Sequence, residues 1–115
     1  MIPKKVSMEA LTASDRQALD SLMAQLRKLY AERLKQVILY GHKSRGERGS
    51  DLDILVVIEG ITDRFAEMSR IHRITGPITV DEDILITAVP VDADYLEQQR
   101  GTSFFAAILQ DGIPL

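Results

Sequence analysis

Residues 37–58 read VILYGHKSRGERGSDLDILVVI, two short apolar runs on either side of a polar segment. The runs, Val37–Tyr40 and Ile54–Ile58, are rich in branched side chains and carry no charge, which is typical of strands buried on both faces of a sheet. The segment 41–53 contains three glycines, three lysine or arginine residues and three acids. It is too short to hold a full crossover helix, so we expect a mixed sheet whose central strands have polar chemistry between them.

Upstream of this stretch, apolar residues recur at helical spacing from Leu19 to Leu34. Ser14 followed by Gln17 forms a capping box, a pattern that begins many helices. The spacing therefore predicts an amphipathic helix over about 15–34, with its apolar face directed toward the core.

Downstream, turn and stop signals divide the chain into shorter elements. Thr62 or Asp63 is expected to begin a second helix that ends at Gly76–Pro77, because glycine and proline stop helices. The remaining elements predicted from such signals are a third strand over Ile84–Val89, a short helix from Asp92 or Asp94, and a last helix over Phe104–Gln110. The expected fold class is therefore α+β, with two layers in which a small mixed sheet packs against helices.

Two features of the predicted helices concern exposed side chains. We expect Phe104 and Phe105 to anchor the last helix, and because adjacent residues of a helix cannot both face one core fully, one of them is open to a partner. His72, which has no second histidine at metal-ligand spacing, is expected at the surface.

The length of 115 residues is that of one domain, and neither a repeat nor a linker divides the chain. We therefore expect a single domain over 1–115, with an N-terminal helix over about 15–34, a core over about 37–90 and C-terminal helices over about 92–111. Fourteen basic and seventeen acidic side chains give a formal charge of −3, which excludes a general polyanion binder. We expect no direct binding of nucleic acid.

Cysteine is absent, which excludes disulfides, thiolate zinc sites and thiol nucleophiles. No apolar run approaches the roughly 18 residues of a membrane span, and no apolar segment of a signal peptide follows the charged start of the chain. We therefore expect a cytoplasmic protein without membrane contact.

Two aspartates, Asp51 and Asp53, stand two residues apart where the second apolar run begins. Side chains at this spacing in a strand point to the same face, so the two carboxylates share one small space. Their repulsion favours a divalent cation between them, and Mg²⁺ prefers oxygen ligands. A second ion needs a third carboxylate nearby. Asp83, expected to open the third strand, is the first choice, and Asp81, on the same predicted strand face, is the alternative.

The segment before these aspartates is predicted to form an anion site beside the cation site. Gly41 leaves the first strand, and one or two helical turns over 43–47 would direct free backbone N–H groups toward an anion. Lys43 and Arg45 add charged donors. An anion site beside a cation site is what a metal-bound nucleoside triphosphate requires.

The motifs LYGH (39–42), SRG (44–46) and SDLDILV (50–56) together resemble the signature of the minimal nucleotidyltransferases, a branch of the DNA polymerase beta superfamily. The resemblance extends from about Val37 to Val89. It implies a nucleotidyltransferase fold, two Mg²⁺ ions, and ATP or another nucleoside triphosphate as substrate. The residues it implies as metal ligands and catalytic carboxylates are Asp51, Asp53 and Asp83. The residues implied for nucleotide binding are Gly41, His42, Lys43, Ser44, Arg45 and Ser50.

The function implied by this resemblance is transfer of a nucleoside monophosphate, AMP from ATP, to a hydroxyl group with release of pyrophosphate. Many short members of the family resemble antitoxins that act with a helical ribonuclease toxin of the HEPN family, in some cases by modifying a tyrosine of that toxin. The resemblance therefore implies a HEPN-type protein as partner and acceptor. Whether the chain forms homo- or hetero-oligomers stays open.

Two features differ from the family pattern. His42 stands where the family has serine after the glycine, so an imidazole or nearby Ser44 replaces that hydroxyl, and the segment 46–51 is shorter than the common form. These differences motivate a second hypothesis, a binding module that keeps the fold, has lost turnover and neutralises a partner by contact. A third hypothesis, transfer to a small hydroxylated compound such as an aminoglycoside, calls for a second substrate domain and is disfavoured.

Overall fold

The computed structural model describes residues 8–44 and 50–115. Its sheet has four strands in the order β3–β2–β1–β4. The strands are β1 (Leu34–Ser44), β2 (Ser50–Ile58), β3 (Leu85–Asp92) and β4 (Ile113–Pro114). β1 pairs antiparallel with β2 and β4, whereas β2 pairs parallel with β3. The sheet is therefore mixed, as the sequence predicts, and the two apolar runs lie in its central strands.

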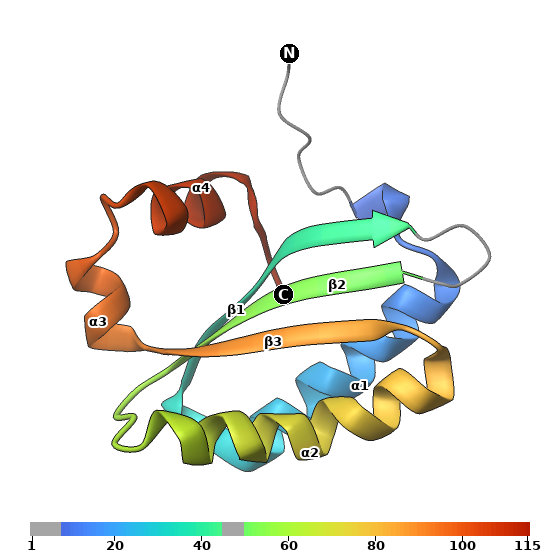
Figure 1. Cartoon of the computed structure of the whole chain (residues 1–115), viewed down its shortest axis with the longest axis horizontal. Coiled ribbons are helices and arrows are strands. Elements are labelled where there is room, and N and C mark those ends of the chain that lie inside the picture. The colour runs from blue at the N-terminus through green and yellow to red at the C-terminus, as the bar shows by residue number, and fades with distance from the viewer. Residues whose placement is uncertain (1–7, 45–49) are drawn as a thin grey trace.

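Helices cover the two faces of the sheet unequally. The helices are α1 (Ala13–Tyr30), α2 (Arg64–Glu82), α3 (Ala93–Gln98) and α4 (Ser103–Asp111), with short 3-10 helices over Met8–Ala10 and Ala31–Arg33. α1 and α2 pack on one face, which we call the inner face, and α3 and α4 pack on one end of the other, which we call the outer face (Figure 1). The predicted α+β class, a small mixed sheet packed against helices, is confirmed.

Alternation along β2 sorts its side chains between two cores. Even-numbered residues of Leu52–Ile58 are buried against α1 and α2, whereas Leu55 and Val57 are buried in the smaller cluster with α3 and α4. By the same alternation Asp51 and Asp53 belong to the outer face, nearer the start of β2 than the cluster under α3 and α4. β2 thus contributes side chains to both cores and also positions both carboxylates on the outer face.

α1 begins at a different cap from the one expected. The hydroxyl oxygen of Thr12 accepts a hydrogen bond from the backbone N–H of Asp15, and the Asp15 carboxylate accepts one from the backbone N–H of Thr12. This capping box replaces the predicted pair Ser14 and Gln17. The helix ends at Tyr30 because Ala31, with φ of 49°, leaves the helical conformation, and so α1 is shorter at its C-terminus than predicted.

A buried polar cluster joins the C-terminus of α1 to α2. The hydroxyl of Tyr30 donates to Oε2 of Glu67 at 2.6 Å, and Arg70 donates to Oε1 of Glu67 at 2.9 Å. Burial raises the pKa of Tyr30, and the Glu67 carboxylate raises it further. Because Glu67 is almost completely buried, these partners offset the cost of removing its charge from water.

α2 is longer than the sequence predicts, since it continues through Gly76–Pro77 to Glu82. A proline inside a helix removes one hydrogen bond and opposes its ring to the carbonyl four residues earlier, at a cost of about 3 kcal/mol. The helix continues because Ile71, Ile74 and Ile78 are buried on the inner face on both sides of the exposed proline. The prediction that the helix ends at Gly76–Pro77 is therefore wrong.

The C-terminal part follows the predicted order with one addition. β3 runs to Asp92, beyond the predicted end at Val89, and Asp92 caps α3. The short strand β4, which the sequence did not predict, pairs with β1. On α4, Phe105 is half-buried against the smaller cluster whereas Phe104 is 57% exposed, so the two rings do not face the core equally.

In residues 8–44 and 50–115, no helix combines the length and apolar character of a membrane span.

Candidate functional site

The two predicted metal ligands lie together on the outer face. Asp51 and Asp53 are both half-buried and come from the first part of β2. The residues paired with them are Lys43 and Gly41 in β1, and Leu85 and Thr87 in β3. The structure thus brings the two carboxylates to one face of the two central strands, as their spacing predicts, and we call them the carboxylate pair.

Gly41 is the residue that lets the carboxylate pair lie close to β1. A Cβ atom at Gly41 would overlap Oδ2 of Asp53 and would lie 3.0 Å from the Cβ of Asp53. No larger residue fits this position unless the Asp53 side chain moves. The glycine predicted to contact a triphosphate is therefore directly beside a predicted metal ligand, and the reason for glycine here is close approach.

Tyr40 is a member of the site to which the sequence interpretation gave no role. An irregularity in the β1–β2 register falls between Leu39 and Gly41, and it contains Tyr40. Burial raises the pKa of Tyr40, and the negative charge of Asp53 raises it further. The ring of Tyr40 contacts the ring of Phe104 edge to face, with centroids 6.2 Å apart. The phenol therefore stays protonated near neutral pH and connects the carboxylate pair to α4.

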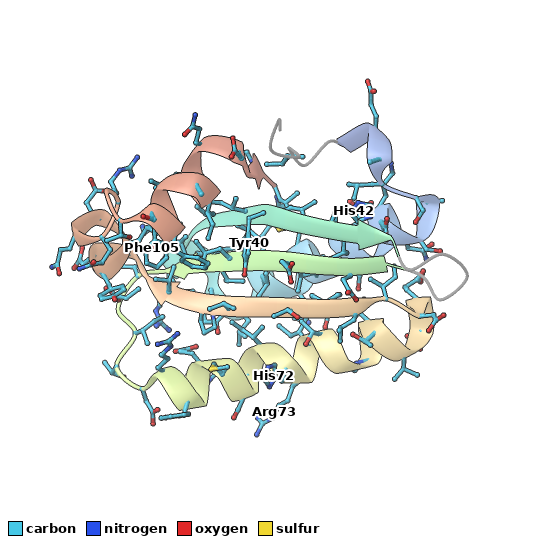
Figure 2. All side chains as sticks on the ribbon, turned by 45° about the horizontal axis from the view of Figure 1, so that its top comes forward. Tyr40, His42, His72, Arg73 and Phe105 are labelled. Atoms are coloured by element: carbon cyan, nitrogen blue, oxygen red, sulfur yellow. The ribbon has the colours of Figure 1, made fainter. Side chains whose placement is uncertain are left out.

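His42 lies on the inner face, away from the carboxylate pair. Its cross-strand partner is Leu52, a residue of the core under α1 and α2, and its Nε2 lies 3.0 Å from Oδ2 of Asp15 at the start of α1. Figure 2 shows the labelled His42 beside α1, with Tyr40 and Phe105 further along the sheet. The imidazole is therefore engaged with Asp15 on the face opposite the carboxylate pair, and its contact with a phosphate stays a prediction.

The other predicted nucleotide-binding residues fall at the turn end of the β1–β2 hairpin, where β1 ends and β2 begins. Lys43 and Ser44 continue β1, and Ser44 pairs with Ser50 of β2. Lys43 and Ser44 are therefore extended, which corrects the expected helical turn at its first two positions. Arg45 and the rest of that turn, to Glu47, lie in the segment 45–49, which is outside the described residues.

The third predicted carboxylate is not on a strand. Asp83 follows the last residue of α2, caps that helix with φ of 53° and is exposed, while Asp81 lies within the helix. The predictions that Asp83 opens the third strand and that Asp81 shares its face are therefore wrong. Because β3 begins at Leu85, the residue opposite Asp53 on the outer face is Thr87, which is exposed and carries no charge.

The carboxylate pair has the donor chemistry for one divalent cation. Two carboxylates on adjacent same-face positions provide the oxygen ligands that Mg²⁺ prefers. In the described part of the chain, however, no three histidine, aspartate or glutamate side chains gather into a group that could hold a metal ion. The described residues thus fit one ion held by Asp51 and Asp53 and do not supply the third carboxylate that a two-ion site requires.

A row of aromatic rings extends from the carboxylate pair across the outer face. The ring centroids of Phe104 and Phe105 are 5.2 Å apart, and those of Phe105 and Tyr95 are 6.2 Å apart, all edge to face. We call Tyr40, Phe104, Phe105 and Tyr95 the aromatic row. The adjacency of Phe104 and Phe105 was the only sequence signal for it, since contacts between β1, α3 and α4 are set by tertiary packing.

Comparison of the chain with protein-family models, with curated proteins and with solved structures gives no match in any of the three.

Proposed function

We propose that the chain binds a metal-bound nucleoside triphosphate on the outer face and transfers its nucleoside monophosphate, AMP from ATP, to an acceptor hydroxyl. The observation that supports this proposal is the position of Asp51 and Asp53, which share one face of β2, with Asp53 directly against Gly41. The resemblance of the 39–56 motifs to minimal nucleotidyltransferases supplies the reaction class.

In this proposal the carboxylate pair holds the cation, and Gly41 allows the triphosphate to approach the backbone of β1. By the resemblance, Lys43 and Arg45 would supply positive charge for the phosphates. A bound Mg²⁺ ion neutralises charge on the phosphate oxygens. The acceptor oxygen forms a bond to the α-phosphorus and the bond from that phosphorus to the bridging oxygen breaks. Pyrophosphate leaves with the electron pair, and the hydroxyl proton passes to solvent.

The acceptor in this proposal is a tyrosine hydroxyl of a HEPN-type partner protein. This assignment follows from the resemblance alone. The site is compatible with an acceptor carried by another protein, because the carboxylate pair lies on the outer face beyond the cluster formed with α3 and α4. A second ion would need Asp83, which stands two residues before Leu85 but is not grouped with Asp51 and Asp53 in the described structure.

Transfer of label from ATP tests the enzyme directly. The purified chain is incubated with ATP labelled at the α-phosphate, Mg²⁺ and the candidate HEPN-type partner, and label on the partner is measured. The expected result is labelling that Asp53→Asn abolishes and that Asp20→Asn, an exposed aspartate of α1, leaves intact. Labelling that survives Asp53→Asn would contradict the proposal.

A second candidate function, a binding module without turnover, is favoured by the uncharged Thr87 opposite Asp53 and by the engagement of His42 with Asp15. Such a module would neutralise the partner by contact. Its signature is binding of the partner that Asp53→Asn does not weaken, together with an absence of transfer from ATP. Transfer that depends on Asp53 would rule it out.

A further inference from the structure

A pocket lies between the outer face of the sheet and the helices α3 and α4. Its volume is about 410 Å³, within the range of small-molecule sites. Its lining combines apolar side chains of β2 and β3 with the rings of Tyr95, Phe104 and Phe105, and its charged members are Arg64 and Asp92. The pocket is therefore apolar and aromatic, with a few polar groups at fixed positions.

The pocket is next to the carboxylate pair along the same strands. Leu55, which lines the pocket, follows Asp53 by two residues on the outer face, and Val89 follows Thr87 in the same way. Two residues of a strand span about 7 Å. The contact between Tyr40 and Phe104 continues the connection, because Phe104 lines the pocket and Tyr40 immediately precedes Gly41, which lies against Asp53.

The exposed rings of the pocket provide a stacking surface. Phe104 is 57% exposed and Tyr95 is 52% exposed, although both belong to the aromatic row that packs on the sheet. A planar ring placed against them would remove this apolar area from water. Arg64, in the first turn of α2, adds hydrogen-bond donors and a guanidinium group, which suits the polar edge and the face of a heterocycle.

The carboxylate of Asp92 fixes one wall of this pocket. It accepts hydrogen bonds from the backbone N–H groups of Gly60, Ile61, Asp94 and Tyr95. These bonds tie the β2–α2 connection to the start of α3, so both Ile61 and Tyr95 are held where they line the pocket. The pocket is thus built by the fold before any ligand binds.

We propose that this pocket binds the nucleobase of the nucleoside triphosphate whose phosphates lie at Asp51 and Asp53. The inference rests on the proposed function and adds the place where the nucleotide is recognised. Base stacking on aromatic side chains accepts every base, so the pocket provides affinity for a nucleotide over a bare polyphosphate.

The experiment compares two probes that differ only in the nucleoside, the magnesium complexes of ATP and of inorganic tripolyphosphate. Binding of each to the full chain is measured by titration calorimetry. The wild type is expected to bind ATP more tightly. Phe104→Ala is expected to weaken ATP binding about 5- to 140-fold, the effect of removing one stacking ring, while tripolyphosphate binding stays unchanged. Arg64→Gln, an exposed position, should act in the same direction.

The matched control is Phe65→Ala, which removes a ring that is 83% exposed on α2 and outside the pocket, and which should change neither affinity. Equal affinity of the wild type for both probes, or an equal effect of Phe104→Ala on both, would overturn the nucleobase assignment alone. Phe104→Ala that keeps ATP binding but blocks modification of an acceptor would also overturn it. Failure of the wild type to bind either probe would contradict the proposed function itself.

Discussion

Asp53 and Gly41 form the tightest juxtaposition of the candidate site. The carboxylate of Asp53 lies over the backbone of β1 where any side chain at Gly41 would meet it. A glycine in the interior of a strand is otherwise unfavourable, because it loses conformational entropy and packs nothing. Its presence between Tyr40 and His42 is explained by the space that Asp53 and a ligand of Asp53 require.

Gly41→Ala tests this explanation. The added methyl group displaces the Asp53 carboxylate, so we expect magnesium-dependent ATP binding to fall at least about tenfold, with a loss of stability of about 1–3 kcal/mol from overpacking. The control is Gly76→Ala, because a Cβ there meets nothing within 4 Å and alanine favours the helix by about 1 kcal/mol. Calorimetry and urea unfolding measure both quantities. Unchanged ATP binding in Gly41→Ala would refute the role of close approach.

Thr87 occupies the position at which a two-ion site would need its third carboxylate. It lies opposite Asp53 on the outer face, where a carboxylate would become the third ligand. We expect Thr87→Asp to bind Mg²⁺ at least about tenfold more tightly than Thr87→Asn, because it adds a charged oxygen ligand. Without Mg²⁺ the aspartate variant should be the less stable of the two, since three carboxylates repel. Magnesium titrations that do not distinguish the two variants would contradict this geometry.

The sequence predicts the positions of Asp51 and Asp53 in the sheet, but it does not predict the position of Thr87. Asp51 and Asp53 share a face because side chains alternate along one strand, and this local rule needs no tertiary information. Thr87 is opposite Asp53 because of the register between β2 and β3, which are separated by α2. Pairing across such a distance is fixed by core packing, which local sequence rules do not predict. The sequence interpretation therefore chose Asp83 without knowing which residue of β3 lies opposite Asp53.

The contact between α1 and β1 is built by the pair Asp15 and His42. Asp15 is completely buried, completes the capping box of α1 with Thr12, and places its Oδ2 3.0 Å from Nε2 of His42. The pair fixes the start of α1 against the end of β1 that carries Gly41. At this scale His42 is a structural residue whose side chain lies on the face opposite the carboxylate pair.

His42→Ala separates this structural role from nucleotide contact. Loss of the hydrogen bond to Asp15 is expected to lower the free energy of unfolding by about 1–3 kcal/mol. The affinity for magnesium-bound ATP, measured below the unfolding transition, should remain within about twofold of the wild type. A large loss of ATP affinity without a loss of stability would show that the imidazole acts on the nucleotide instead.

Asp92 caps α3, and its contribution to the free energy of unfolding is expected to change with pH. Hydrogen bonds from backbone N–H groups, with that of Ile61 the strongest, lower the pKa of Asp92 below its usual 3.8. A carboxyl whose pKa is lowered by folding adds stability above its unfolded pKa, and that stability is lost as pH falls through the folded value. We expect Asp92→Asn to cost about 1 kcal/mol at pH 7 and progressively less below about pH 4. A difference from wild type that is the same at pH 7 and pH 3 would contradict this.

α2 shows why element boundaries were predicted less well than element order. Local rules end the helix at Gly76–Pro77, but Ile71, Ile74 and Ile78 continue at helical spacing through the proline and are buried together. Their combined burial exceeds the cost of one proline, since each fully buried isoleucine contributes roughly 1.5–3 kcal/mol. The sequence contains both the apolar spacing that continues the helix and the Gly76–Pro77 pair that ends it. Burial in the tertiary core favours the first.

The whole molecule is asymmetric about its sheet. The inner face is covered by two long helices, whereas the cluster on the outer face is formed with two short helices at one end only. The carboxylate pair, the aromatic row and the pocket all belong to this less covered face. In the described part of the chain the fold therefore separates a fully covered face from a less covered face, on which the proposed site lies.

Magnesium-dependent binding of ATP is the measurement that tests the proposed function most directly. Titration calorimetry of the full chain with ATP is carried out with Mg²⁺ and with EDTA, and is repeated with the double variant Asp51→Asn and Asp53→Asn. The amides keep the size of the side chains and remove both charges. The proposed function predicts binding of one ATP that requires Mg²⁺ and is lost in the double variant. ATP binding that is equally strong in EDTA, or that the double variant retains, would contradict it.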